Sequence, residues 1–189
     1  MYDLTNTPNL KPFRQYNEND VVNLFAHTDG SVNRGTVVKA VSGDMTAHPN
    51  QYGSSVDSNS PSRATSLRAV VPWKMSTCSS GDTNVLGILL YDIRETNAYG
   101  EKYIFQPRYE TSEQQVVISG QAAPVLTKGI VEINGFSGTP GPGSGAIVST
   151  VAAGKLLVSN DVAKFGAGRV GTFLTTSGAD GYALLKIEL

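Results

Sequence analysis

The sequence is a succession of short β-forming runs interrupted by turn residues, and this pattern restricts the chain to an all-β fold. The clearest run is C-terminal: alternate positions from Ala183 to Leu189 are apolar, whereas Lys186 and Glu188 between them are charged. A period of two places the apolar side chains on one face of a strand. No stretch shows the period of a long amphipathic helix. Short strands separated by turns predict a β-sandwich or a small β-barrel.

The first strand pair is predicted around a tight turn. Residues 21–26 and 35–41 are β-forming runs, and Asp29-Gly30 between them supplies a turn position with positive φ. We therefore expect these two runs to pair as a hairpin. Further strands are expected over residues 67–73, 84–93, 114–119, 128–133, 146–151, 155–159, 169–175 and 181–189.

The ends and the loops suggest how the chain is organised. Residues 1–20 have no periodicity and contain two prolines, so we expect an extended N-terminal arm followed by a β domain over residues 21–189. Residues 125–189 could form a smaller barrel within that domain. Two long loops are expected, the polar segment 43–66 and the glycine- and proline-rich segment 135–145.

Charge and composition argue against several classes of protein. Sixteen acidic and fifteen basic residues are spread along the chain, which does not favour binding to nucleic acid. No run approaches the roughly 18 apolar residues of a membrane span, and the first residues lack the pattern of a signal peptide. The single cysteine, Cys78, excludes an internal disulfide and is expected to be a free thiol.

Candidate catalytic and ligand-binding residues are few. His27 and His48 are the only histidines, and we expect both to be surface imidazoles. The glycine-rich loop lacks the Gly-Lys-Ser/Thr ending that binds phosphates, and its prolines remove amide donors. No metal-ligand spacing is recognisable. We therefore expect no enzymatic activity, no cofactor and no metal.

Two parts of the sequence resemble the decoration, or cement, proteins of tailed bacteriophage capsids. The first is the segment 16–26, from Tyr16-Asn17-Glu18 into Asn23-Leu24-Phe25-Ala26, followed by Gly35-Thr36-Val37-Val38. The second is C-terminal, and it consists of Gly-led strands and Asn-Asp or Asp-Gly turns over residues 153–161, 168–174 and 178–187. Segment 43–119 contributes nothing to this resemblance.

The resemblance implies a non-enzymatic structural virion protein. Such a protein would be made in the host cytoplasm, assemble as a homotrimer, bind the outer surface of the capsid and bridge major capsid subunits. The alternatives are a tail, fibre or head-appendage component, or a carbohydrate- or receptor-binding β-sandwich. The expected capsid contacts are apolar residues of the arm: Tyr2, Leu4, Leu10, Phe13 and Tyr16.

Overall fold

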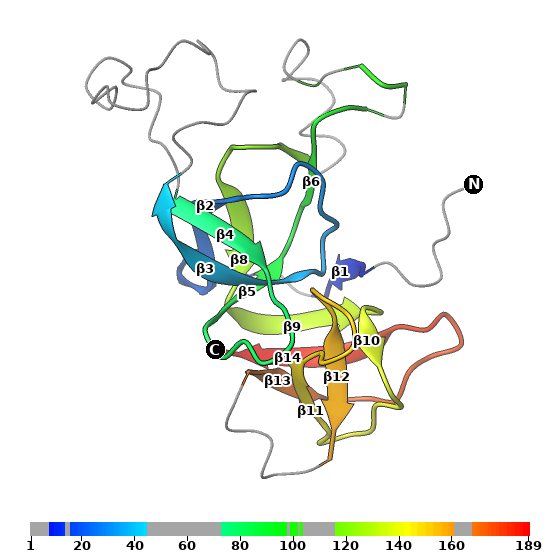
Figure 1. Cartoon of the computed structure of the whole chain (residues 1–189). Helices are drawn as coiled ribbons and strands as arrows, with labels where there is room; N and C mark the ends of the chain where they lie inside the picture. Colours follow the sequence, from blue (N-terminus) through cyan, green and yellow to red (C-terminus); the bar gives the residue numbers. More distant parts are fainter. Residues whose placement is uncertain are drawn as a thin grey trace.

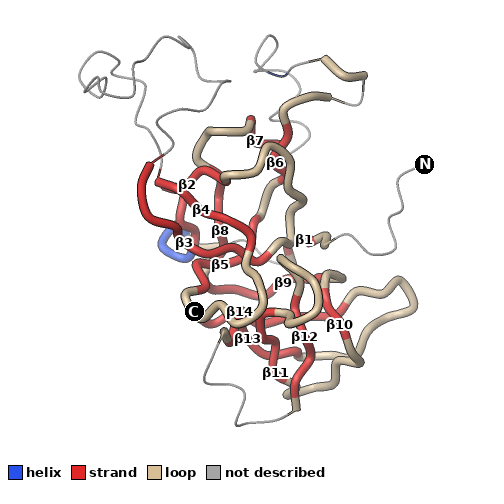
Figure 2. Tube along the Cα trace, in the orientation of Figure 1, coloured by secondary structure: helices blue, strands red, loops and turns tan. Residues whose placement is uncertain are grey.

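The protein is described by a computed structural model that covers residues 8–13, 16–44, 73–97, 99–101, 103, 116–160 and 168–189. Within these residues the regular structure is almost all strand, as Figure 2 shows. The one named helical element is a 3-10 turn, η1 (Glu18–Asp20), which the side chain of Asn17 caps by accepting a hydrogen bond from the amide of Asn19. The all-β fold expected from the sequence is confirmed.

Five strands close into a barrel. Its strand order is β2-β4-β3-β5-β8. The strands are β2 (Val21–His27), β3 (Val37–Asp44), β4 (Trp73–Thr77), β5 (Val85–Leu89) and β8 (Ala123–Leu126). In Figure 1 the barrel occupies the upper half of the described structure.

Seven strands form a second sheet with the order β1-β9-β14-β13-β11-β12-β10. The strands are β1 (Leu10–Pro12), β9 (Lys128–Ile133), β10 (Phe136–Ser137), β11 (Gly145–Val148), β12 (Leu156–Ser159), β13 (Arg169–Phe173) and β14 (Ala183–Glu188). Figure 1 shows this sheet below the barrel. The strands after residue 128 thus belong to this sheet, whereas the closed barrel is built from strands between residues 21 and 126.

A small third sheet flanks the barrel. It pairs β6 (Asp92–Arg94) in parallel with β7 (Val116–Ile118). The run predicted as one strand over residues 84–93 is therefore divided into β5 and β6, with Leu90 and Tyr91 between them.

The predicted hairpin between residues 21–26 and 35–41 is wrong. Both runs are strands, but β2 pairs in parallel with β4 and antiparallel with β8. The connection does not fold back on β2 because it is held elsewhere. Val32 forms an isolated bridge with Ile93, and the amide of Gly35 donates to the carbonyl of Leu89.

The barrel and the seven-stranded sheet share one hydrophobic core. Fully buried side chains of the barrel, such as Ile88 and Leu126, belong to the same cluster as Val131 and Leu185 of the sheet. The alternation predicted for the last strand is confirmed within β14, where Ala183, Leu185 and Ile187 are buried and Lys186 and Glu188 are exposed. Leu189, predicted on the same apolar face, lies after the strand and is 47% exposed. A shared core means that neither sheet covers its apolar face without the other.

The segment predicted as an N-terminal arm contributes directly to this core. Residues 10–12 form β1, which pairs antiparallel with β9 and places Leu10 opposite Ile133. The Leu10 side chain is fully buried in the shared cluster. Within the described residues, this part of the chain is an edge strand of the sheet. Of the predicted strand 67–73, only Trp73 lies among the described residues.

Candidate functional site

His27 is buried in the barrel wall, so the expectation of a surface imidazole is wrong. The amide of Asp29 donates to Nδ1 at 3.0 Å, which leaves the proton on Nε2 to be donated to Thr77 Oγ1 at 3.1 Å. Burial lowers the pKa of His27, against a smaller opposing effect of the Asp29 carboxylate. The Nε2 bond therefore joins β2 to β4, and the Nδ1 bond holds the turn that follows β2. His48 lies outside the described residues.

Cys78 is a free buried thiol, as the sequence predicted. Burial is the main cause that raises its pKa to about 12, and the nearby Asp82 carboxylate adds to the shift. Because the thiolate is the reactive form, this thiol is a poor nucleophile at neutral pH. Asp82 itself accepts a hydrogen bond from Lys39 Nζ at 2.8 Å and from the amide of Ser79 at 2.6 Å. These two bonds hold the pKa of Asp82 below its usual value.

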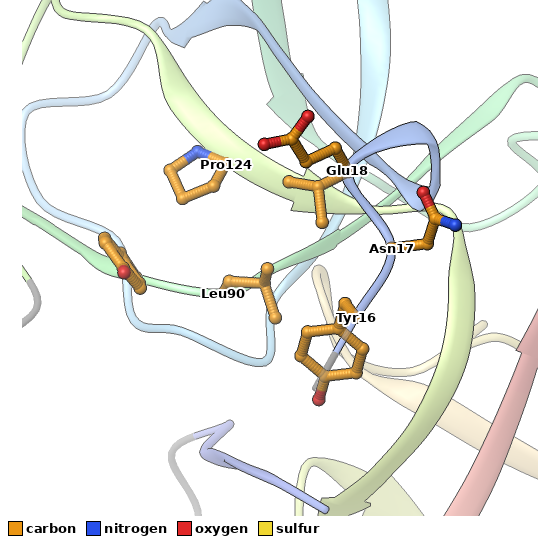
Figure 3. Close-up of a pocket in the computed structure, with 7 residues that line it drawn as sticks. Tyr16, Asn17, Glu18, Leu90 and Pro124 are labelled. Atoms are coloured by element: carbon orange, nitrogen blue, oxygen red, sulfur yellow. The ribbon is translucent and has the colours of Figure 1, made fainter. Parts of the chain in front are cut away.

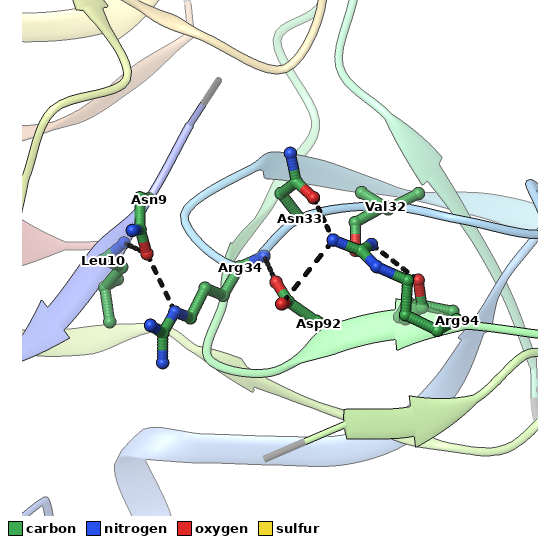
Figure 4. A network of polar contacts seen from close by, with 8 residues as sticks. Asn9, Leu10, Val32, Asn33, Arg34, Asp92 and Arg94 are labelled. Atoms are coloured by element: carbon green, nitrogen blue, oxygen red, sulfur yellow. Dashed lines mark hydrogen bonds and ion pairs between the residues drawn. The ribbon is translucent and has the colours of Figure 1, made fainter. Parts of the chain in front are cut away.

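A polar network joins β1, the loop before β3 and β6 (Figure 4). Arg34 Nε donates to Asn9 Oδ1 at 2.8 Å, and the Arg34 amide donates to Asp92 Oδ1 at 2.7 Å. Arg94 then bonds the carbonyl of Val32 at 2.8 Å and lies 3.5 Å from Asp92 Oδ2. These charged groups fasten the N-terminal strand to the barrel.

Gly35 allows the network to close. Its φ is +85°, and a Cβ at this position would lie 2.9 Å from the carbonyl carbon of Asn9. Only glycine accommodates both the positive φ and this close backbone approach. The network is thus a structural junction in which the polar groups serve the fold.

An aromatic pair with one exposed member, Trp73, lies where β2 and β4 run side by side. Phe25 and Trp73 are register partners, with ring centroids 5.9 Å apart and ring planes inclined at 46°. Phe25 packs on the barrel core, whereas Trp73 is 56% exposed. Leu24, the neighbour of Phe25, is 54% exposed. Large exposed aromatic side chains that rest on a rigid strand are typical of protein-binding surfaces.

A shallow hollow of about 370 Å³ opens at the other end of β2. Figure 3 shows Tyr16, Glu18, Leu90 and Pro124 around it. Asn17, Val21 and Tyr91 complete its lining. Leu90 is almost completely buried and forms apolar floor, whereas Tyr91 is 38% exposed. The hollow therefore combines an apolar base with two tyrosines and an acidic rim.

The lining of the hollow is fixed in position by backbone contacts. The Tyr16 hydroxyl donates to the carbonyl of Ile130 at 3.5 Å, and burial raises the Tyr16 pKa. A Cβ on Gly129 would lie 3.0 Å from the Tyr16 ring, so a glycine there makes room for the ring. The Leu90 amide donates to the carbonyl of Pro124 at 3.1 Å, which ties the floor to β8.

The five capsid contacts predicted from the sequence have different environments in the structure. Tyr2 and Leu4 lie outside the described residues. The Leu10 side chain is fully buried in the core of its own chain, so it presents no surface to another protein. Phe13 is 45% exposed, and the half-buried Tyr16 lines the hollow.

The surface residues Glu18 and Tyr91 were missed by sequence reasoning. The signal at Tyr91 is present in the sequence, because Tyr91-Asp92 interrupts an otherwise apolar run. The position of Glu18 beside Leu90 depends on the pairing of β2 with β8, which no local pattern indicates.

Searches for known chemistry and known relatives identify no counterpart. Among the described residues, no group of three or more His, Cys, Asp or Glu side chains is arranged to hold a metal ion. In the same part of the chain, no helix has the length and apolar character needed to cross a membrane. No family model, curated protein or solved structure matches this chain.

Proposed function

We propose that this protein is a non-enzymatic structural component of a virion. It binds the outer surface of a capsid lattice as a homotrimer and stabilises the head by bridging major capsid subunits. The observation that carries this proposal is the exposed Trp73, which contacts the tilted ring of Phe25 on the barrel wall. The identity of the lattice comes from the sequence resemblance to capsid decoration proteins.

The chemistry-bearing groups described above support a structural role. His27 joins strands, the thiol of Cys78 is buried with a raised pKa, and the charges around Arg34 fasten β1 to the barrel. Trp73 and Leu24, by contrast, are large apolar side chains that the described part of the chain leaves more than half exposed. Truncation of a central interface aromatic commonly weakens binding by about 2 kcal/mol or more, which is roughly thirtyfold.

Co-sedimentation with expanded phage heads stripped of accessory proteins tests the proposal. Wild-type protein should bind saturably at a fixed ratio to the capsid subunit, and Trp73→Ala should weaken binding by roughly thirtyfold or more. The matched control is Tyr99→Ala, which removes another aromatic that is 91% exposed. Thermal unfolding of each variant checks that folding is unchanged.

Two results would contradict the proposal. Absence of saturable binding by folded wild-type protein to intact heads would remove the capsid role. Equal loss of binding in the Trp73 and Tyr99 variants would remove Trp73 as the contact. Sedimentation equilibrium of the protein, free and after release from heads, tests the trimer.

A further inference from the structure

The hollow between Tyr16 and Tyr91 carries a more specific inference about the partner. We infer that it accepts the guanidinium group of an arginine side chain from the bound protein. This inference deepens the proposed function and rests on it, because it names the chemistry of the partner at a site separate from Trp73.

The rim of the hollow is acidic. Glu18 is exposed at the edge of the hollow, and no cationic side chain among the described residues pairs with it. Asp20, in the same 3-10 turn, adds a second acidic residue nearby. Among the described residues that line the hollow, Glu18 is the one charged side chain, and its carboxylate favours a cationic ligand.

The shape and the aromatic content of the hollow also restrict its ligand. Two tyrosines stand beside an apolar floor formed by Leu90 and Pro124. A volume of about 370 Å³ lies near the small end of ligand sites, which span roughly 300–1,000 Å³. It therefore suits one side chain better than an extended segment.

A guanidinium group can use both the carboxylate and the aromatic rings. A guanidinium group is planar and weakly hydrated, so it stacks on an aromatic ring while its donors bond a carboxylate. An ammonium group offers a point charge without the flat surface, and a neutral sugar ring leaves the Glu18 charge unused. Arginine is the side chain that uses the rings and the carboxylate together.

Part of the lining is held in place by hydrogen bonds before any ligand binds. Tyr16 is anchored to the carbonyl of Ile130, Leu90 is tied to Pro124, and Asn17 caps the turn that carries Glu18. Groups that are held in place before binding lose little side-chain entropy when the ligand arrives.

The test uses the isotope-labelled full chain and three probes: N-acetyl-arginine amide, its neutral isostere N-acetyl-citrulline amide, and methyl glucoside. In NMR titrations the arginine probe should shift the amide signals of Glu18, Leu90 and Tyr91, and citrulline should shift them much less. Glu18→Gln should weaken arginine binding by roughly threefold to tenfold. Glu101→Gln, which removes an exposed carboxylate elsewhere, is the control and should leave binding unchanged.

Each outcome decides between explanations. Equal shifts with arginine and citrulline, or an unchanged affinity in Glu18→Gln, would overturn the inference. Shifts with methyl glucoside alone would assign the hollow to a carbohydrate. Tyr91→Ala provides a second variant, in which arginine binding should also fall.

Co-sedimentation separates this inference from the proposed function. If wild-type protein fails to bind heads, the capsid role fails whatever the NMR titration shows. If wild-type protein binds but Glu18→Gln and Glu101→Gln bind equally well over a range of salt concentrations, the arginine contact fails and the capsid role stands.

Discussion

Replacing Leu10 with alanine should test whether the N-terminal strand is part of the cooperative core. The Leu10 side chain is fully buried opposite Ile133, in the cluster that the barrel and the sheet share. A buried Leu→Ala change costs roughly 2–5 kcal/mol, because transfer energy is lost and a cavity remains. Since β1 is an edge strand that can partly collapse into the cavity, we expect about 2–3 kcal/mol.

Unfolding in urea, followed by tryptophan fluorescence and circular dichroism, measures this loss directly. For a chain of this size, 2–3 kcal/mol lowers Tm by roughly 4–12 °C. The control is Lys11→Ala at the neighbouring position, whose side chain is 49% exposed in its contact with Asp180. That change should cost less than about 1 kcal/mol. Equal effects of the two substitutions would refute the assignment of Leu10 to the core.

Two further substitutions probe the sheet and the barrel. Gly171→Ala should lower the free energy of unfolding in urea by roughly 2–3 kcal/mol or more, because its Cβ would lie 2.0 Å from the backbone oxygen of Lys186. Gly141→Ala is the control and should cost far less, because the nearest atom to its Cβ would be 3.6 Å away. A similar stability for both variants would contradict the close strand approach. The pKa of His27 is lowered in the folded state, so the unfolded chain binds a proton first as the pH falls. The free energy of unfolding should therefore decrease from pH 8 to pH 5, and it should decrease less in the His27→Gln variant. An equal loss in the variant would assign the pH dependence to other groups.

The strands that sequence predicted best are those whose pattern is local. In β14, alternation separates buried Leu185 and Ile187 from exposed Lys186, and the structure follows it. β9 begins and ends at the predicted residues, 128 and 133. A strand with one face on a core repeats every two residues, so its existence can be recognised without knowledge of its partners.

Strands that contain proline escaped detection. β8 includes Pro124, and β1 ends at Pro12. Proline lacks an amide donor, which argues against a central strand when only the sequence is considered. In β8 the carbonyl of Pro124 still accepts from Leu90, and β1 lies at an edge, where the missing donor costs little.

The partners of strands and the burial of polar groups depend on the tertiary structure. Asp29-Gly30 suggested a hairpin, yet the bridge between Val32 and Ile93 directs the chain away from β2. His27 stands next to polar turn residues, and its burial follows from the pairing of β2 with β4. The hollow has the same origin, because Glu18 and Leu90 are brought together by strands that are distant in sequence. Tyr16 was selected as an apolar anchor, but the acidic rim beside it was not predicted.

The pairing of β1 with β9 has a consequence for biosynthesis. The amide of Asn9 bonds Asn134, a residue 125 positions later in the chain. A ribosome adds about 5–20 residues per second, so on the order of 6–25 s separate the synthesis of these two residues. During that time β1 has no strand to pair with, and the sheet cannot form around its N-terminal edge. Nascent chains stalled before residue 128 should therefore bind holding chaperones at the first strand. These chaperones should dissociate from chains that are long enough to include β9.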